Sequence, residues 1–310
     1  MNADDISINI VNYNNIQFLQ NCIKSIYENT KKINFSILII DNFSSDNSIE
    51  LIEKTFPTIK IIRNNKNIGF AKAQNTGFDK VDSRYILILN PDTLILDNSI
   101  EKMVLFLDRN PEAGIVGPII LNPDKSNQCT GITYPNNVNL LSETLFLDRF
   151  FPNNRIFGKH KKTFEPYRDT KQVDYLQGSC LMIRKKVIEE IGIFDEDFFM
   201  YFEETDFCYR AKRKGWSITR LGDCSIIHFG GGETGYYDEF RLLQYTRSLI
   251  LFYKKHYSIT AVLALKVILS LRNITRLILW LLIGLTLRNR RKESKSRLKG
   301  YFKSFKLLLD

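Results

Sequence analysis

Short apolar runs alternate with segments of helical length through the first half of the chain. Five runs rich in β-branched residues predict strands, at 6–11, 35–40, 59–63, 85–90 and 113–120. The segments between them predict helices at 16–28, 47–56, 70–80 and 98–109. This alternation is typical of a parallel sheet covered on both faces. We therefore expect an α/β fold with a mostly parallel central sheet flanked by helices.

Polar side chains follow several of these apolar runs. Asn12, Asp41 and Asn64 come at the ends of three predicted strands. Pro91 cannot donate to a sheet ladder, so a fourth strand ends before it and Asp92 lies just beyond. Ligands of open α/β sheets bind outside the carboxyl ends of the strands. Taken singly, Asp41 and Asp92 are more often turn residues; four polar strand ends together are a first indication of a site.

A second patterned stretch begins near residue 173. "GSCLMIR" (178–184) predicts a strand, followed by one helix to residue 191 and another over 202–214, ended by Gly215. The first turn of the later helix holds Glu203, Glu204 and Asp206. Acidic residues there complement the helix dipole. Three carboxylates within four residues exceed what a helix start needs, so a catalytic role is the alternative.

Asp92, His228 and the carboxylates at 203–206 have the chemistry that substitution at a phosphate ester requires. His228 follows the strand-like run "SII" and precedes three glycines. A carboxylate oxygen and a neutral imidazole are ligands for Mn²⁺ or Mg²⁺, which neutralise the charge on a departing diphosphate. A separate carboxylate can take the proton of an incoming hydroxyl. A satisfied structural histidine is the simpler interpretation of His228 alone.

The order of these motifs resembles that of family 2 glycosyltransferases. The matching stretches are "INIVNYNN", "IIDNFSSDNS", "NKNIGFAKAQNTGF", "YILILNPDT", "GSCLMIRKKVIEEIGIFDEDFFMYFEETDFCYRAKRKGW" and "HFGGGET". They are most similar to rhamnosyltransferase-like bacterial members that build surface polysaccharides, and the resemblance runs from residue 6 to about 256. It implies a GT-A (Rossmann-like) fold and inverting transfer from a nucleotide-diphosphate sugar.

The resemblance also implies roles for individual residues. Asp41 takes the place of the carboxylate that hydrogen-bonds a pyrimidine base, which favours uracil or thymine. Gly178 and Ser179 match the segment that passes close to the donor sugar, where glycine allows close backbone approach. The other residues expected around the nucleotide are Asn12, Tyr13, Asn67, Gly69, Phe70 and Asn75.

The expected metal site departs from the family pattern. Asn90-Pro91-Asp92 takes the place of the family's two-aspartate metal motif, so the site has one charge fewer. Asp92 keeps the usual metal contact, and His228 matches the residue that completes metal or diphosphate binding. The implied cofactor is a divalent cation, Mn²⁺ or Mg²⁺.

The expected catalytic base lies in the acidic motif. Its second residue, Glu204, matches the base, although relatives usually have aspartate there. Asp206 is the reserve candidate, and Glu203 completes the catalytic cluster.

The net charge of +10 lies entirely in the C-terminal segment 259–310. That segment contains twelve Lys and Arg and two acidic residues, so the rest of the chain is neutral. A nucleic-acid enzyme would carry basic residues around its cleft, so this distribution predicts no nucleic-acid partner. Five widely spaced cysteines without a CxxC pair indicate reduced thiols, and the N-terminus shows no secretion-signal pattern.

The basic tail is also apolar. Its longest uncharged run, 277–287, is too short for a bilayer of about 30 Å. Basic residues among leucines, with Trp280, favour helices lying in the headgroup plane of an anionic membrane surface. The alternatives are a helical cap or a homodimer contact with a solvated basic end.

These observations predict a catalytic domain over 1–235, with a long loop region at 121–172, and a C-terminal helical extension over 236–310. The expected enzyme moves rhamnose from dTDP-rhamnose to a lipid-linked or polysaccharide acceptor. We expect it to be peripheral on the cytoplasmic face of a bacterial membrane. Rival donors are a UDP-hexose and UDP-galactofuranose. Rival functions are a catalytically silent membrane assembly subunit and a nucleotidyltransferase, although the latter's glycine-rich phosphate loop is missing from "INIVNYNN".

Overall fold

The computed structural model describes residues 5–78, 80, 82–128, 133–151, 154, 168–230 and 239–309. The chain divides into two compact units. The first comprises Met1–Ile132, Pro166–Phe199 and Glu203–Gly232, and the second Thr133–Glu165, Met200–Phe202 and Glu233–Asp310. The expected domain boundary at residue 235 falls outside the described residues and stays a prediction.

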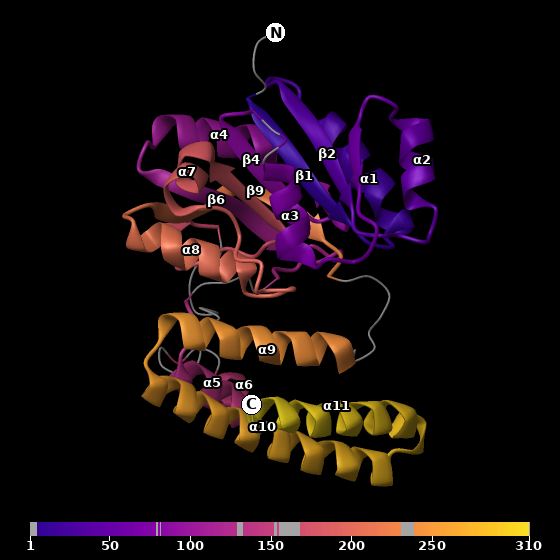
Figure 1. The fold of residues 1–310 in the computed structure, drawn as a ribbon, viewed down its shortest axis with the longest axis vertical. Coiled ribbons are helices and arrows are strands. Elements are labelled where there is room, and N and C mark those ends of the chain that lie inside the picture. Colours follow the sequence, from indigo (N-terminus) through magenta and orange to yellow (C-terminus); the bar gives the residue numbers. More distant parts are fainter. Residues whose placement is uncertain are drawn as a thin grey trace. The chain divides into compact units, whose positions relative to one another are not determined.

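The first unit is built on one mixed sheet that is mostly parallel. Its strand order is β3-β2-β1-β4-β8-β6-β9-β5, with β7 paired to β9 (Figure 1). Strands β3, β2, β1 and β4 are mutually parallel, β8 is antiparallel to both of its neighbours, and β6 runs parallel to β9. The strands are β1 (Ile6–Asn12), β2 (Phe35–Asp41), β3 (Lys60–Arg63), β4 (Tyr85–Leu89), β5 (Thr93–Ile95), β6 (Ala113–Leu121), β7 (Lys171–Gln172), β8 (Cys180–Arg184) and β9 (Ser217–His228).

Six helices of this unit cover the two faces of the sheet (Figure 1). They are α1 (Ile16–Asn29), α2 (Ser48–Thr55), α3 (Phe70–Phe78), α4 (Ser99–Arg109), α7 (Lys185–Ile191) and α8 (Glu203–Arg213). Successive strand residues point to opposite faces. Accordingly, Leu87 and Leu89 of β4 pack in the core with α1, α2 and α4, whereas Ile86 and Ile88 pack with α3, α7 and α8. The expectation of a sheet flanked by helices is confirmed.

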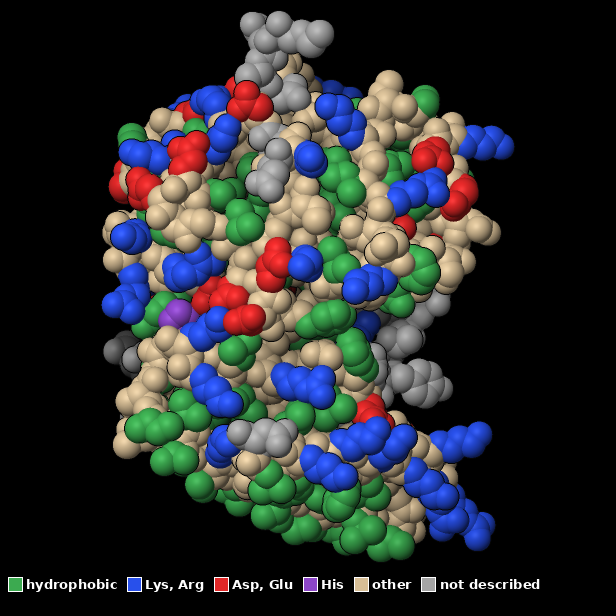
Figure 2. Space-filling model, in the orientation of Figure 1, with side chains coloured by type: hydrophobic (Ala, Val, Ile, Leu, Met, Phe, Trp, Pro, Cys, Tyr) green, Lys and Arg blue, Asp and Glu red, His purple; other side chains and the backbone are tan. Residues whose placement is uncertain are grey.

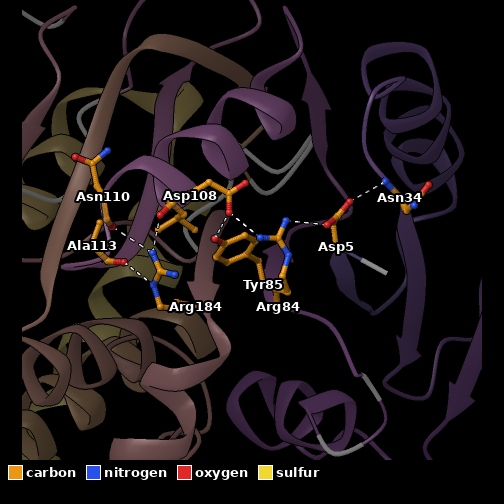
Figure 3. A network of polar contacts seen from close by, with 9 residues as sticks. Asp5, Asn34, Arg84, Tyr85, Asp108, Asn110, Ala113 and Arg184 are labelled. Atoms are coloured by element: carbon orange, nitrogen blue, oxygen red, sulfur yellow. Dashed lines mark hydrogen bonds and ion pairs between the residues drawn. The ribbon is translucent and has the colours of Figure 1, made fainter. Parts of the chain in front are cut away.

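A polar network lies where β4 begins and β8 ends (Figure 3). The ends of the strands form two opposite edges of the sheet, and this network lies at one of them. Arg84 donates to Asp5 and to Asp108, at 2.7 Å each, and the Tyr85 hydroxyl donates to the same Asp108 carboxylate at 2.6 Å. Arg184 donates to three backbone carbonyls, those of Leu107, Asn110 and Ala113. These bonds tie the ends of β4 and β8 to α4 and to the start of β6.

The expectation of a long loop over 121–172 is wrong for part of that range. Residues Asn137–Thr144 form α5 and Leu147–Phe150 form α6, both in the second unit. The Asn-rich stretch that suggested a loop is a helix start: the Asn136 side chain accepts a hydrogen bond from the Asn139 N–H, at 3.0 Å. Residues 129–132, 152–153 and 155–167 lie outside the described part of the chain.

The second unit contains the long helices of the C-terminal extension. They are α9 (Glu239–His256), α10 (Ile259–Thr286), the short 3₁₀ helix η1 (Arg288–Arg290) and α11 (Arg291–Leu309). α10 begins at the Ser258 side chain, which accepts from the Ala261 N–H. At about 1.5 Å per residue, its 28 residues are long enough to cross a bilayer. Among the helices of the described residues, α10 is the one that is long and apolar enough to be a candidate membrane span, judged by length and composition only. The uncharged run 277–287 remains too short to cross a bilayer by itself; α10 is longer because the helix continues through the charged residues at 266, 272 and 276.

α10 exposes an apolar stripe. Eight side chains, all but the adjacent Leu281 and Leu282 following one another at three, four or seven residues, are each at least 47% exposed: Ile259, Leu263, Val267, Ile274, Ile278, Leu281, Leu282 and Leu285. Figure 2 shows hydrophobic side chains along α10, with Lys and Arg side chains gathered toward its C-terminal end. Such a continuous exposed apolar face marks an interaction surface.

Candidate active site

The predicted site residues gather at the edge of the sheet opposite the Arg84–Asp108 network. Asn12 and Asp41 are the last residues of β1 and β2, and they are register partners. Because β8 runs antiparallel to β4, the amino end of β8 meets the carboxyl end of β4, where Leu89 pairs with Cys180. His228, at the end of β9, pairs with Thr93 at the start of β5. Strand polarity thus brings together residues far apart in the sequence.

At one end of this edge, Asn12 and Asp41 belong to a buried polar cluster. The Asn12 side-chain amide lies 3.2 Å from Asp41 Oδ1, 3.0 Å from Ser44 Oγ and 2.8 Å from Ser48 Oγ. The other carboxylate oxygen of Asp41 accepts from the Ser44 N–H at 3.1 Å. Asn12 Oδ1 is buried without a hydrogen-bond partner. Tyr13, the next residue, is 47% exposed. The cluster holds the Asp41 carboxylate in a fixed orientation.

Asn42, which the sequence reasoning missed, organises the adjoining turn. Its Oδ1 accepts from the Ile68 N–H at 3.0 Å, and its Nδ2 donates to Asn67 Oδ1 at 2.9 Å. Asn67 in turn accepts from the Gly69 N–H at 3.0 Å. Gly69 has a φ of +87°, and a Cβ there would lie 2.6 Å from the carbonyl oxygen of Phe199. Only glycine fits this position, so the predicted nucleotide segment has a tightly specified backbone.

Two residues predicted to contact the nucleotide, Asn75 and Phe70, form hydrogen bonds with other parts of the fold. The Asn75 side chain donates to the Phe194 carbonyl at 2.9 Å and accepts from the Phe194 N–H at 3.0 Å. Phe70 packs against the buried cores beside α3, and its N–H donates to the Phe199 carbonyl at 2.7 Å. These bonds give both residues positions in the fold; their contact with a nucleotide stays a prediction.

At the other end of the edge, Asp92 and His228 face each other. Asp92 Oδ1 lies 3.4 Å from His228 Nε2, and each side chain is 9% exposed. The backbone locks the pair: the Phe229 N–H donates to the Asp92 carbonyl at 3.0 Å, beside the β5–β9 pairing. Phe18 of α1 packs on Phe229, with ring centroids 5.0 Å apart.

Gln128 sets the tautomer of His228. Its Nε2 donates to the His228 carbonyl oxygen at 2.6 Å, so its Oε1 is the atom 3.0 Å from His228 Nδ1. An amide oxygen only accepts, which requires the proton on Nδ1. Nε2, the nitrogen beside Asp92, is therefore the one with a lone pair in the neutral ring. An outer partner of this kind is common for metal-binding histidines. No sequence pattern pointed to Gln128, which lies in an irregular stretch.

This pair fits a divalent cation that is shared with a ligand. A carboxylate oxygen and an imidazole nitrogen 3.4 Å apart can face one ion. In the described part of the chain, no cluster of three or more His, Cys, Asp or Glu residues is suited to a metal ion. Two protein ligands suit Mg²⁺-type sites, where phosphate oxygens and water supply the remaining positions.

A continuous path of contacts connects Asp92 with Glu204. The Asn90 N–H donates to the Ser179 carbonyl at 2.9 Å, which places Ser179 beside the end of β4. The adjoining Gly178 lies against Glu204, since a Cβ on that glycine would be 3.6 Å from Glu204 Cγ. Ser179 Oγ is buried without a hydrogen-bond partner. The structure thus brings the expected base and the expected metal pair to the same edge of the sheet.

Burial changes the proton affinity of the two glutamates at the start of α8. It raises the pKa of Glu204 to about 7, against weaker lowering by the first-turn N–H groups and Thr205. Burial, followed by repulsion from Glu204, raises the pKa of Glu203 well above its usual value. Glu203 is 5% exposed, and its Oε2 has no hydrogen-bond partner. A carboxyl group with a pKa near 7 suits general base catalysis at neutral pH.

Asp206 is held in an ion pair. Its Oδ2 accepts from Arg210 Nε at 2.7 Å, and its side chain is 2% exposed. Arg210 also donates to the carbonyls of Ile191 and Ile193, so the pair joins α8 to the segment after α7. A carboxylate used in this way is a weaker candidate for the base than Glu204.

The chain is similar to known proteins in sequence and in fold. A model described as "Glycosyl transferase family 2" matches residues 7–192. The N-acetylglucosaminyl-diphospho-decaprenol L-rhamnosyltransferase of Mycobacterium tuberculosis is 27% identical over 213 residues, which cover 64% of this chain and 68% of that protein. The dTDP-rhamnosyl transferase RfbF of Shigella flexneri is 26% identical over 210 residues, covering 66% of this chain and 63% of that protein.

Among solved structures, the chain is similar to a mannosyltransferase, PcManGT, from Pyrobaculum calidifontis, in complex with GDP-Man and Mn²⁺. The TM-score is 0.58 at 12% identity, and the alignment covers 98% of this chain and 87% of that one. At this identity, the likeness shows a shared fold.

Proposed function

Because the chain belongs to glycosyltransferase family 2 and has the GT-A fold expected from its sequence, we propose that it transfers rhamnose from dTDP-rhamnose, with inversion, to a hydroxyl of a lipid-linked acceptor. One arrangement of residues carries the mechanism. Glu204, with a pKa of about 7, lies against Gly178, and the next residue, Ser179, accepts a hydrogen bond from the N–H of Asn90, two residues before Asp92.

Glu204 is the proposed base. Its carboxylate accepts the proton of the acceptor hydroxyl as the hydroxyl oxygen forms a bond to the anomeric carbon. The bond between that carbon and the diphosphate oxygen breaks on the opposite side, and the diphosphate leaves with the electron pair. Inversion in one step needs no covalent sugar–enzyme intermediate. The partly exposed Glu204 side chain is accessible to a substrate, whereas Glu203 and Asp206 are buried.

Asp92 Oδ1 and His228 Nε2 are the proposed holders of Mn²⁺ or Mg²⁺. Gln128 supports this role because it keeps the proton on the other ring nitrogen. When bound, the cation supplies positive charge that stabilises the departing diphosphate. Asn90 adds no charge, so only one carboxylate belongs to the pair.

Asp41 supports a pyrimidine nucleotide. Asn12 and Ser44 hold its carboxylate at the end of β2, where it can accept from a thymine or uracil N–H. The choice of rhamnose and dTDP follows the two relatives, of which one is named an L-rhamnosyltransferase and the other a dTDP-rhamnosyl transferase. UDP-hexose and UDP-galactofuranose are the competing donors.

The first relative's name specifies an acceptor on decaprenol diphosphate, which supports a lipid-linked acceptor for this chain. The apolar stripe of α10 and the basic side chains after it support attachment to an anionic membrane surface. The proposed location is the cytoplasmic face of the membrane.

A panel of donors tests this proposal directly. The full chain is incubated with dTDP-rhamnose, UDP-glucose, UDP-galactofuranose and GDP-mannose, with Mn²⁺ and with EDTA, and nucleoside diphosphate release is measured with an N-acetylglucosaminyl-diphospho-polyprenol acceptor, whose sugar supplies the hydroxyl. We expect release from dTDP-rhamnose that depends on the metal and the acceptor. Release from a UDP sugar alone would replace the donor, and no release from any donor would favour the silent-subunit alternative.

Asp92→Asn separates the metal role from folding. Its carboxamide keeps the shape of the side chain, so we expect an unchanged melting temperature and a loss of metal-dependent turnover. Normal turnover and normal Mn²⁺ dependence in this variant would remove Asp92 from the metal site.

Membrane attachment is tested by flotation with vesicles containing phosphatidylglycerol. Leu281→Gln with Leu285→Gln changes two exposed side chains of α10, so the helix packing is kept. We expect these changes to release the protein from vesicles, while equal flotation would contradict the surface role. Deleting the tail is a poor test, because α5 and α9 pack against α10.

A further inference from the structure

Two arginines lie on the inner face of α10, where apolar residues are expected. Leu265, Leu269 and Trp280 are buried at this face, and Arg272 and Arg276 fall between them at helical spacing. The exposed apolar stripe is on the other side of the same helix. Guanidinium groups remain charged in proteins, and burying a charge is strongly unfavourable without an anionic partner.

The guanidinium of Arg276 is packed but incompletely bonded. It lies 3.7 Å above the ring centroid of Phe146, and its Nη2 lies 3.3 Å from the Glu143 carbonyl oxygen. Its Nη1 is buried with no hydrogen-bond partner. Arg149 lies over the same ring, 5.5 Å from its centroid. Two cations therefore share one aromatic side chain.

Arg272 is still less well bonded. Both its Nε and its Nη2 are buried without a hydrogen-bond partner. Burial lowers the pKa of Arg276, and the positive charges of Arg272 and Arg149 lower it further, against the opposing effects of Tyr301 and Asp148. The guanidinium groups of Arg149 and Arg272 thus both repel that of Arg276, and among the causes of the shift that lie in the described residues Asp148 is the one carboxylate.

Another arginine of the same unit, Arg297, has the carboxylate partner that a partly buried guanidinium group needs. Arg297 of α11 lies 4.3 Å from the ring centroid of Trp280 and is paired with Glu293, at 2.9 Å. Arg272 has no such bond to a carboxylate in the part of the chain that the structure describes. The difference indicates that the cluster of Arg149, Arg272 and Arg276 is kept for an anion supplied from outside the chain.

We propose that this arginine cluster binds the phosphate or diphosphate group of a ligand, which in the proposed function is the diphosphate of the lipid-linked acceptor. Arginine forks match phosphate oxygens in geometry and charge. The lipid source is favoured because the same helix carries the exposed apolar stripe on its other face. The inference rests on the proposed function for the identity of the lipid only; anion binding by the cluster needs neither donor nor transfer.

The test measures binding of inorganic pyrophosphate and of farnesyl diphosphate to the full chain by calorimetry, with dTDP and UDP present to fill the donor site. Arg272→Met removes the unpartnered N–H groups. Arg288→Met is the matched control, since it makes the same change at an exposed position of η1. We expect Arg272→Met to lose at least about tenfold in affinity for both probes, whereas the control keeps it.

Thermal unfolding separates binding from folding. Because Arg272→Met replaces two buried nitrogens that lack hydrogen-bond partners with an apolar side chain, we expect its melting temperature to stay the same or rise. Arg276→Gln is a second variant, with the same expected loss of pyrophosphate binding. Unchanged pyrophosphate affinity in both variants, or an equal loss in the Arg288→Met control, would overturn the proposal.

The two probes distinguish the source of the phosphate. Tighter binding of farnesyl diphosphate than of pyrophosphate assigns the cluster to a lipid, and equal binding assigns it to a free phosphate compound. Failure of sugar transfer with intact Arg272-dependent binding would reject the proposed function alone.

Discussion

The two edges of the central sheet carry similar side chains but use them differently. At one edge, Arg84, Tyr85 and Asp108 bond to one another and Arg184 bonds to backbone carbonyls (Figure 3). At the other, Asn12 Oδ1, Ser179 Oγ and Glu203 Oε2 are buried without hydrogen-bond partners.

Native structures rarely leave buried polar atoms unbonded, so each exception needs a reason. At the edge with the Arg84–Asp108 network, charge holds the fold together. At the site edge, the polar groups are incompletely bonded and the pKa of Glu204 is raised to about 7, which costs stability and leaves atoms ready for a substrate. The comparison predicts that changes at the first edge lower stability and changes at the second lower activity.

Glu204→Gln is expected to give the largest effect. Loss of the base should lower kcat by about 10²- to 10⁴-fold, measured as release of the nucleoside diphosphate with acceptor present. The same variant should unfold at an equal or higher temperature at pH 8, because the neutral amide avoids the burial of a charge.

Asp206→Asn is the control for that variant, because Asp206 is bonded to Arg210. It should lose stability and keep a larger share of its turnover than Glu204→Gln does. A larger loss of turnover in Asp206→Asn would move the role of base to that residue.

Gln128→Leu should have a smaller effect on the site. Without the amide, the proton of His228 is no longer confined to Nδ1, and losing such a support typically lowers metal affinity or activity about 10- to 100-fold. The half-saturating Mn²⁺ concentration for turnover reports this change. Gln128→Glu keeps an acceptor at Nδ1, so it should retain more metal affinity. Equal Mn²⁺ dependence in the unchanged protein, Gln128→Leu and Gln128→Glu would exclude a role for Gln128 in orienting His228.

Asp108→Ala tests the opposite edge. It leaves the buried Tyr85 hydroxyl and Arg84 without their shared acceptor, so we expect a loss of about 1 kcal/mol after allowing for the partial exposure of Asp108. A fall of about 2–4 °C in melting temperature would follow, with kcat unchanged. A fall in kcat without a fall in melting temperature would contradict the division between the edges.

The smallest expected effect is a difference in pH dependence. Hydrogen bonds from Tyr85 and Arg84 lower the pKa of Asp108 although burial opposes them, so its stabilising contribution is present above pH 4 and lost as pH falls. The raised pKa of Glu204 has the opposite effect on stability, because the stability of the protein declines as pH rises from about 4 to about 7. Thermal unfolding of each variant is therefore compared with that of the unchanged protein at pH 4 and at pH 8. Relative to the unchanged protein, the melting temperature of Asp108→Ala should be lower at pH 8 than at pH 4, and that of Glu204→Gln should be higher at pH 8 than at pH 4.

Much of the first unit follows from local sequence patterns. The expected strands and helices in its first half agree with the structure within about two residues, because fully buried strands such as Tyr85–Leu89 are uninterrupted apolar runs. Pro91 marked the end of that strand correctly. The start of β9 at Ser217 was missed, because the polar residues Thr219, Arg220 and Asp223 mask its strand pattern.

Long-range partners could not be derived in this way. Gln128 and Asn42 define the site through bonds to His228 and to Asn67, and neither has a periodic pattern. The joining of residues 133–150 with the tail helices is likewise invisible to local periodicity. The apolar tail was recognised, but which face of α10 held Arg272 depended on the packing.

The apolar stripe of α10 has a kinetic consequence. If that face rests on a bilayer, as we propose, the enzyme and any acceptor carried in the same leaflet move in two dimensions. A scarce lipid then has a high effective concentration at the enzyme, so glycan output would follow the surface density of acceptor lipid more closely than its total amount.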